Sequence, residues 1–280
     1  MKKAPLNYER QYMDNLKQIV DIGTEEFNER TGVATRRITG TMIKVDLEEE
    51  FPILLSKTVN WKPCLREIFW IMQKNSNNIK DLGSKIWDQW ADENGSVGKT
   101  YGYQVGKQVT DKFKTYTSQV QYVLERLAAN PSDRQCVIDM WNPEELGEMN
   151  LPPCVYSSIW SIIDGRLNCT VIQRSADYPV GVPFDTTGYA FLTHMFARHL
   201  GVRVGTLVHF MADSHIYVNQ LDGVEVQLAN WETLKKIPPT TAPKLVFREG
   251  APTNFWAMTP EDIDIVDYAP MGKITYEVSK

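Results

Sequence analysis

In this 280-residue chain, residues Val155–Ile163 read VYSSIWSII, the next two are Asp164-Gly165, and Leu167–Gln173 reads LNCTVIQ. Both longer runs contain the β-branched and aromatic residues that favour strands. An Asp-Gly pair between two such runs is a strong signal for a tight hairpin turn. Along the second run Cys169, Val171 and Gln173 alternate onto one face. The sequence therefore predicts an antiparallel hairpin.

The residues at the two open ends of this hairpin suggest chemistry. Leu151-Pro152-Pro153-Cys154 leads into the first strand, and Gln173-Arg174-Ser175-Ala176-Asp177 ends the second. A thiol that follows two prolines is a candidate nucleophile. An arginine that arrives nearby on the later strand would lower the pKa of the thiol and hold an anionic substrate.

Apolar periodicity and turn signals place further elements around the hairpin. We predict helices at 8–22, 63–73, 116–130, 187–200 and from 217 to 229, and strands at 38–45, 136–141 and 206–211. A tail rich in proline follows residue 238. No internal repeat or linker is evident, so we predict one α+β domain over residues 1–280.

The composition excludes several classes of protein. Hydrophobic residues make up 42%, charged residues 23%, and the net charge is -5. We expect no binding to a nucleic-acid polymer, since no Lys/Arg-rich block is present. No apolar run approaches the ~20 residues that a membrane helix needs. The four cysteines fit neither a zinc motif nor a disulfide framework, and the first residues are polar. These features predict a reduced, cytoplasmic protein without a metal.

A series of short motifs occurs in a fixed order along the chain. They are Arg30-Thr31-Gly32, Phe51-Pro52-Ile53-Leu54, Glu67 with Trp70, Ile86-Trp87-Asp88-Gln89-Trp90-Ala91, Tyr101-Gly102, Pro152-Pro153-Cys154, Gln173-Arg174-Ser175, Asp177, Gly181, Pro183-Phe184 and Asp213-Ser214-His215-Ile216-Tyr217. Together they resemble the thymidylate synthase family over nearly the full length. The resemblance implies a twisted mixed β-sheet flanked by helices and a homodimer formed through the sheet face.

The same resemblance implies a reaction. A cysteine thiolate adds to carbon 6 of a pyrimidine nucleotide, and carbon 5 then accepts a one-carbon unit from 5,10-methylenetetrahydrofolate. Cys154 would be the nucleophile, and Glu67, Asp185 and Tyr101 would complete the catalytic set. Glu67 is the single acid in an apolar helical stretch, so we expect a raised pKa suited to proton transfer.

The resemblance also assigns binding roles. Nucleotide contacts fall on Arg30, Arg134, Arg174, Ser175, Gln173, His215 and Tyr217, with Arg134 reaching the site of the partner subunit. Folate contacts fall on Trp87, Ile86, Asp177, Gly181, Phe184 and Lys57.

Departures from the family pattern point to the substrate. The uracil enzymes carry Asn where this chain has Asp185. A carboxyl group accepts from the amine of cytosine and shares a proton with the ring nitrogen. Val155, Gly188 and Ile159 replace a His, a Ser and a Gln, and Gln135 replaces an Arg. We therefore predict a cytidine monophosphate 5-hydroxymethyltransferase, with dCMP favoured as its substrate.

The expected product rests on the C-terminal segment Met271–Lys280, which departs from the short apolar tail of the family. A looser tail would admit water and favour a hydroxymethyl product. Four alternatives stay open: a CMP 5-hydroxymethylase of a nucleoside antibiotic pathway, a dCMP 5-methyltransferase, an atypical dUMP thymidylate synthase, and a catalytically silent nucleotide- or RNA-binding relative.

Overall fold

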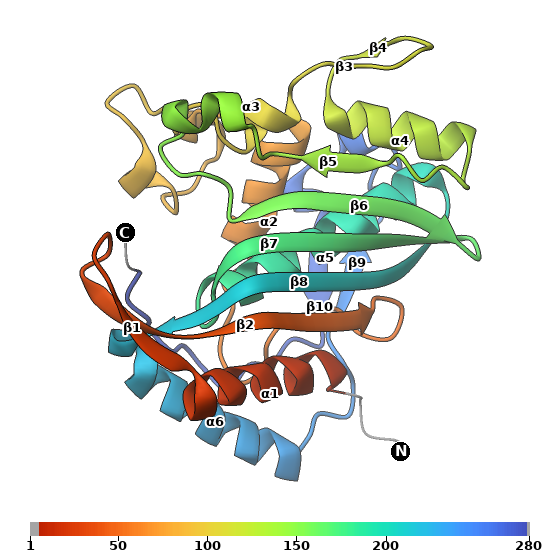
Figure 1. The fold of residues 1–280 in the computed structure, drawn as a ribbon. Coiled ribbons are helices and arrows are strands. Elements are labelled where there is room, and N and C mark those ends of the chain that lie inside the picture. Colours follow the sequence, from red (N-terminus) through yellow and green to blue (C-terminus); the bar gives the residue numbers. More distant parts are fainter. Residues whose placement is uncertain (1–5, 279–280) are drawn as a thin grey trace.

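A six-stranded mixed sheet forms the centre of the computed structural model, which describes residues 6–278 (Figure 1). The strand order is β1-β2-β8-β7-β6-β5. Strands β7 and β8 are parallel, and every other neighbouring pair is antiparallel. The strands of this sheet are β1 (Thr24–Asn28), β2 (Val33–Asp46), β5 (Val137–Asp139), β6 (Val155–Ile163), β7 (Arg166–Asp177) and β8 (Arg203–Tyr217). This is the mixed sheet flanked by helices that the sequence predicts.

The predicted hairpin is confirmed as β6 and β7. Ile163 pairs with Arg166, and both turn residues have positive φ, 53° at Asp164 and 66° at Gly165. A two-residue hairpin turn of type I′ requires positive φ at both of its central residues, and an Asp-Gly pair adopts such angles readily. Strand β7 continues to Asp177, so the motif that starts at Gln173 lies on the strand itself.

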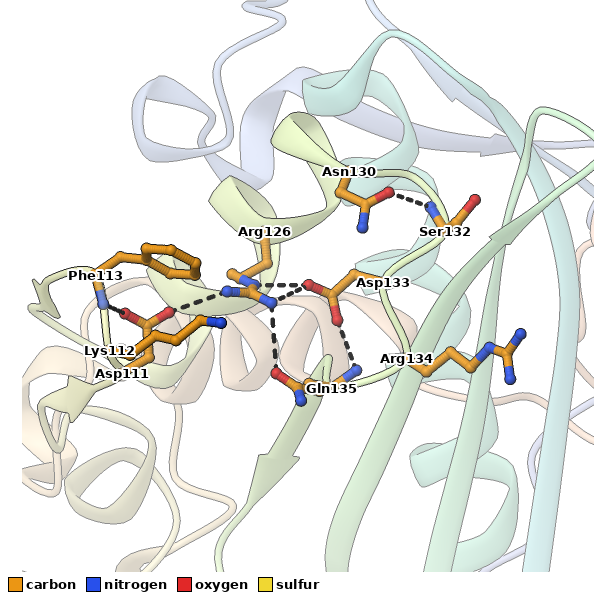
Figure 2. A pocket seen from close by; sticks show the side chains of 9 residues that line it. All are labelled: Asp111, Lys112, Phe113, Arg126, Asn130, Ser132, Asp133, Arg134 and Gln135. Atoms are coloured by element: carbon orange, nitrogen blue, oxygen red, sulfur yellow. Dashed lines mark hydrogen bonds and ion pairs between the residues drawn. The ribbon is translucent and has the colours of Figure 1, made fainter.

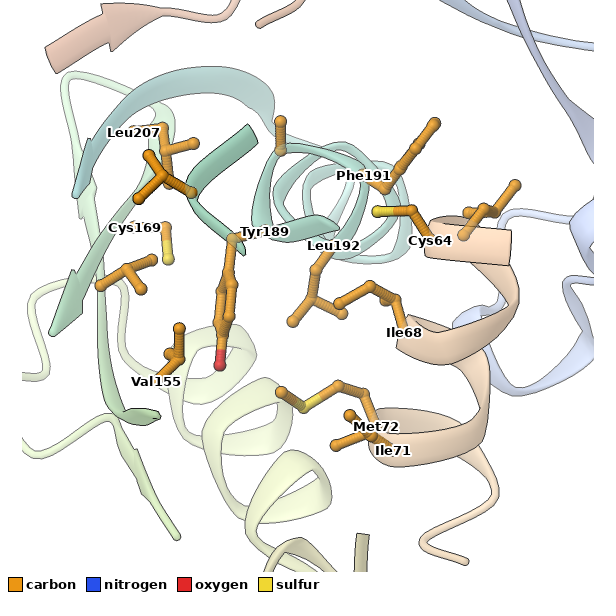
Figure 3. Packing of buried hydrophobic residues seen from close by; sticks show 14 of the residues in the cluster. Cys64, Ile68, Ile71, Met72, Val155, Cys169, Tyr189, Phe191, Leu192 and Leu207 are labelled. Carbon is orange, nitrogen blue, oxygen red and sulfur yellow. The ribbon is translucent and has the colours of Figure 1, made fainter. Parts of the chain in front are cut away.

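Helix α5 (Gly181–Leu200) is buried behind the sheet and packs against α2 (Trp61–Ile68). Gly188 allows their close approach, because a Cβ at this position would lie 3.2 Å from Cδ1 of Ile68. Figure 3 shows Ile68 and Leu192 side by side in the space between the two helices. After Ile68 the chain continues as a π-helical segment, Phe69–Gln73. Such segments occur frequently at functional sites.

Among the remaining elements are α1 (Asn7–Ile22), α3 (Gly102–Val105), α4 (Gln119–Ala129), α6 (Leu221–Lys236) and the two small antiparallel pairs β3 (Val109–Thr110) with β4 (Thr115–Tyr116) and β9 (Lys244–Phe247) with β10 (Ile263–Val266). Helices α1 and α6 lie beside β1 and β2, α3 and α4 lie beyond β5, the β3–β4 hairpin projects from that end, and β9 and β10 lie behind the sheet (Figure 1). None of the helices in the described part of the chain is long and apolar enough to cross a membrane.

One face of the sheet carries exposed apolar side chains. Met42 on β2, Phe210 on β8 and Ile159 on β6 are 45%, 46% and 40% exposed. Met42 and Phe210 are directly paired across the two strands. Alternate residues on the same strands, such as Ile43 and Leu207, are buried against the helices. The sheet therefore has one packed face and one open apolar face.

Several predicted boundaries are wrong. The helix predicted from Tyr116 begins at Gln119, because Tyr116 pairs with Val109 in the β3–β4 hairpin. The helix predicted from Tyr217 begins at Leu221, because the Tyr217 backbone pairs with Thr35 of β2. Helix α5 begins at Gly181 rather than at residue 187, β5 is shorter than predicted, and β1 was not predicted at all.

Candidate active site

A cavity of about 440 Å³ lies where the ends of β7 and β8 meet α5 and the π-helical segment. Most of the predicted site residues line it: Cys154, Glu67, Asp185, Tyr101, Arg30, Ser175, Gln173, His215, Tyr217, Trp87, Ile86, Asp177, Gly181 and Phe184. Residues from distant parts of the sequence are thus brought together as the motif order implies.

The loop that presents Cys154 is fixed by an arginine and a tyrosine. Arg174 donates from Nε to the carbonyl of Pro153 at 3.0 Å and from Nη2 to that of Pro152 at 2.9 Å. The Cys154 backbone N–H donates to the Tyr101 hydroxyl at 3.0 Å. Tyr101 has φ 39°, an unfavourable conformation for an aromatic residue that is typical of functional sites. The backbone that carries the thiol is therefore held in place at the cavity wall.

Two opposing effects set the thiol pKa. Burial raises the pKa of Cys154, and the guanidinium of Arg174 offsets only part of that rise. The nearby Asp185 carboxyl raises it as well. The arginine lowers the thiol pKa as expected, but desolvation is the larger effect, so the net pKa is raised. Arg174 itself does not line the cavity, and its guanidinium is engaged by the two proline carbonyls.

Two half-buried acids, Glu67 and Asp185, line the cavity. Burial raises the pKa of Glu67 to about 7, as predicted in direction, and a hydrogen bond from the Trp87 indole N–H lowers it in part. Burial also raises the pKa of Asp185 well above its usual range, and the charge of Glu67 adds to this rise. In their neutral forms both groups can donate one hydrogen bond and accept others.

At the other side of the cavity, polar groups gather at the ends of β7 and β8. Asp177 accepts from the Gln220 side chain at 3.2 Å and from the Val180 backbone N–H at 3.3 Å. His215 Nδ1 lies 3.2 Å from Asp213, which also binds Arg37, and the ring of Tyr217 packs edge-on against that of His215. This part of the wall offers hydrogen bonds to a polar ligand.

The folate positions form an aromatic wall with a polar end. The ring of Trp87 packs against Trp90 and Tyr101, with centroids 5.2 and 5.1 Å away. A Cβ at Gly181 would lie 3.6 Å from the Asp185 carboxyl and 3.9 Å from Asp177, so its absence leaves space between the two acids. A flat heterocycle with hydrogen-bond donors at its edge fits such a wall. Among residues 6–278 no group of His, Cys, Asp or Glu could hold a metal ion.

Besides Arg174, two predicted binding residues, Lys57 and Arg134, lie away from the cavity. Lys57 is 6% exposed, donates to the Pro179 carbonyl and lies 4.7 Å from the Tyr276 ring centroid. Its ammonium group thus faces the C-terminal tail, and its contact with folate stays a prediction. Arg134 is exposed beside a separate ion-pair cluster. Figure 2 shows Arg126 between Asp111 and Asp133, while Arg134 points away from all three.

The structure adds residues that the sequence did not indicate. Tyr189, one turn of α5 after Asp185, lines the cavity, and its buried hydroxyl has no hydrogen-bond partner in the described structure (Figure 3). Trp90 and Val278 also line the cavity. The i, i+4 spacing of Asp185 and Tyr189 was the one available signal.

The C-terminal tail is well anchored rather than loose. The Met271 N–H donates to the Leu55 carbonyl at 2.8 Å, and the Tyr276 hydroxyl donates to Gln227 at 2.7 Å. Val278 reaches the cavity. The prediction of a loosely held tail is therefore wrong for residues 271–278, and its last two residues, 279 and 280, lie outside the described part.

Comparison with known proteins gives consistent matches. The family model described as "Thymidylate synthase" matches residues 10–280. The chain is 37% identical over 275 residues to a thymidylate synthase of Clostridium beijerinckii, covering 97% of this chain and 98% of the relative. The structure is similar to the thermostable thymidylate synthase A from Bacillus subtilis, with a TM-score of 0.88 and 32% identity over 98% of this chain and 99% of the other.

Proposed function

The chain belongs to the thymidylate synthase family and is a one-carbon transferase, and on this premise we propose that its substrate is a cytosine nucleotide. The family uses methylenetetrahydrofolate, which supplies the one-carbon unit. The observation that carries the proposal is the half-buried Asp185 carboxyl in the cavity wall, close enough to Cys154 to raise the pKa of the thiol and close enough to Glu67 for its own pKa to be raised by that acid.

Cys154 acts as the nucleophile in this proposal. Its thiolate adds to carbon 6 of the pyrimidine, which makes carbon 5 nucleophilic. Because burial raises the thiol pKa, Cys154 is mostly protonated before it reacts. A neighbouring group must accept the thiol proton for the thiolate to form. Glu67, with a pKa of about 7, is the group in the cavity best suited to accept and return protons near neutral pH.

Asp185 selects the base. A neutral carboxyl donates to the unprotonated ring nitrogen of cytosine and accepts from the exocyclic amine. Uracil presents a carbonyl oxygen, a weaker acceptor than the ring nitrogen of cytosine, so the proton of the carboxyl stabilises the cytosine pairing more. An unpaired polar group in a buried site costs about 1–3 kcal/mol, which corresponds to roughly 10- to 100-fold in selectivity.

Release of tritium from carbon 5 of dCMP, CMP and dUMP, each with methylenetetrahydrofolate, tests the substrate. We expect the cytosine nucleotides to release tritium faster than dUMP, with dCMP favoured. Asp185→Asn should move the preference toward uracil by about 10-fold or more. A wild-type preference for dUMP, or a preference unchanged by the substitution, would contradict this assignment. Cys154→Ala should abolish release while nucleotide binding persists.

The product distinguishes two candidates. We propose the hydroxymethyl product, because the half-ionised Glu67 carboxyl can deprotonate a water that adds to the exocyclic carbon. A methyl product is the second candidate. The anchored tail, with Val278 at the cavity, favours it by limiting the access of water. Mass spectrometry of the product separates them, since the hydroxymethyl nucleotide carries one more oxygen atom.

We further propose that a second copy of the chain covers the open sheet face. The exposed apolar side chains of Met42, Phe210 and Ile159 lie near the middle of that face. Contiguous exposed apolar surface of this kind marks an interface. In such a dimer the exposed Arg134 would serve the nucleotide phosphate of the partner subunit, which fits its position away from the cavity of its own chain.

A further inference from the structure

Gln220 lies at a junction of three functional segments. Its side chain is 1% exposed and sits between the end of β8 and α6. The amide nitrogen donates to Asp177 Oδ2 at 3.2 Å and to the backbone carbonyl of Glu277 at 2.9 Å. The amide oxygen accepts from the Tyr217 backbone N–H at 3.2 Å. One side chain thus connects a candidate folate residue, a candidate nucleotide residue and the C-terminal tail.

The C-terminal tail packs into a binding surface formed by α6 and the turn before it. We call this surface, which consists of Asn219, Gly223 and Gln227, the seat of the tail. The Tyr276 hydroxyl has one proton, which is shared between Gln227 Oε1 at 2.7 Å and the Gly223 carbonyl at 3.1 Å. A Cβ at Gly223 would lie 2.7 Å from the Tyr276 ring, so glycine is needed for this contact. Asn219 donates to the Glu277 carboxylate at 2.7 Å. The tail held in this way carries Val278 to the cavity wall.

The chemistry of the junction requires an amide. Asp177 and the Glu277 carbonyl both need a donor, and the Tyr217 N–H needs an acceptor. An uncharged amide supplies both hydrogens and the oxygen at once. A carboxylate at this position would offer only acceptors and would repel Asp177. Gln220 also lowers the pKa of Asp177, which opposes the larger effect of burial.

We propose that Gln220 is a positioning residue that links the orientation of Asp177 to the seating of the C-terminal tail. The tail and the folate then stabilise each other, because both depend on the same amide. Coupling of this kind is reciprocal: a ligand that orders Asp177 must hold the tail more firmly, and a seated tail must strengthen ligand binding. This inference rests on the proposed function in one respect, the contact of Asp177 with folate.

Cleavage by trypsin after the exposed Lys273 reports the opening of the tail. Intact-mass spectrometry follows the loss of residues 274–280, with dCMP present and tetrahydrofolate either present or absent. Tetrahydrofolate lacks the one-carbon unit and binds without turnover. In the wild-type protein we expect tetrahydrofolate to slow this cleavage about 10-fold. In Gln220→Met, which keeps the length of the side chain but loses its hydrogen bonds, we expect fast cleavage that tetrahydrofolate no longer slows.

Tyr276→Phe is the matched control. It removes the two hydroxyl hydrogen bonds of the tail but leaves the contacts of Gln220 in place. We expect faster cleavage that tetrahydrofolate still slows. Loss of the ligand effect in both variants, or in neither, would overturn the proposal. A thermal unfolding curve verifies that Gln220→Met is folded. If it is not, Gln220→Leu and a double-mutant cycle with Asp177→Asn replace it, with non-additive effects on tetrahydrofolate affinity as the expected result.

The affinity of the wild-type protein for tetrahydrofolate, measured by calorimetry, separates two kinds of failure. Absence of binding would contradict the proposed function. Binding that leaves tail cleavage unchanged would contradict the role of Gln220 alone.

Discussion

Glu67 and Trp87 form a contact whose effect on proton transfer can be measured. The indole N–H stabilises the carboxylate and so lowers the pKa of Glu67, which burial otherwise raises. Trp87→Phe removes that donor, so the pKa should rise above about 7. In a plot of kcat/KM against pH, the limb that reflects the ionisation of Glu67 should move to higher pH.

Trp90→Phe serves as the control for this shift. Trp90 also lines the cavity and packs on Trp87, but it makes no hydrogen bond to Glu67 within residues 6–278. Its substitution should leave the position of the limb unchanged. Equal shifts in the two variants would show that general packing, not the indole donor, sets the ionisation of Glu67.

Asp185 should make base preference depend on pH. When neutral, it donates its proton to the ring nitrogen of cytosine, which is a stronger acceptor than the carbonyl oxygen of uracil. As the pH rises and the carboxyl ionises, the cytosine pairing loses this hydrogen bond, whereas the carboxylate still accepts from the ring N–H of uracil. The ratio of kcat/KM for dCMP to that for dUMP should therefore fall with pH. Titration of Glu67 affects both substrates and cancels in the ratio.

Asp185→Asn provides the comparison, since an amide does not titrate. In this variant the ratio should stay flat over the same pH range. A flat ratio in the wild-type protein would mean that Asp185 keeps its proton, or that it does not contact the base.

Individual site residues were predictable where a motif fixes them and unpredictable where only the fold does. Cys154 and Asp177 stand in short patterns with a recognisable chemical logic. Gln220 carries no local signal, because its role arises from a contact with the distant Glu277, and Tyr189 carries only its i, i+4 spacing from Asp185. The pKa of Cys154 could not be predicted from Arg174 alone, since it depends on the depth of burial.

Among the secondary-structure elements, the hairpin was the most predictable, because Asp164-Gly165 defines its turn locally. Helix α5 was predicted too short at its N-terminus, where Gly181 and Pro183 favour a loop when read alone. The end of β8 was misassigned as helix since Tyr217 forms strand pairs only because β2 lies beside it. Short sequence patterns determine where turns occur. The ends of helices and strands depend instead on contacts with segments that are distant in the sequence.

The contact between α6 and the tail gives a prediction at the level of elements. Gly223→Ala places a Cβ 2.7 Å from the Tyr276 ring and 3.3 Å from Ile274, so the tail must leave its seat. Alanine also favours the helix by up to about 1 kcal/mol over glycine. We expect faster tryptic cleavage after Lys273, by about fivefold or more, because the added methyl group displaces the tail from α6.

Gly147→Ala is the matched control for this variant, because a Cβ at Gly147 would meet no atom within 4 Å. Its cleavage rate should equal that of the wild-type protein. A Gly223→Ala protein that keeps the wild-type cleavage rate would show that the tail does not depend on the seat.

For the whole molecule, the open sheet face predicts the state of association. Phe210→Lys places a charge opposite Met42 in the middle of the apolar face. Burial of an unpaired charge is costly, so the dimer should not form. Sedimentation velocity should show a dimer for the wild-type protein and a monomer for the variant. A wild-type monomer would remove the proposed role of the sheet face.

Mixing two inactive variants tests whether Arg134 acts across that interface. Cys154→Ala lacks the nucleophile, and Arg134→Ala should bind the nucleotide phosphate poorly. In a mixed dimer, the subunit that retains Cys154 receives an intact Arg134 from its partner. Statistical mixing makes half of the dimers mixed with one complete site each, so activity should recover to about a quarter of the wild-type value. If Arg134 instead served its own chain, the mixed dimer would contain no complete site, and mixing would restore nothing.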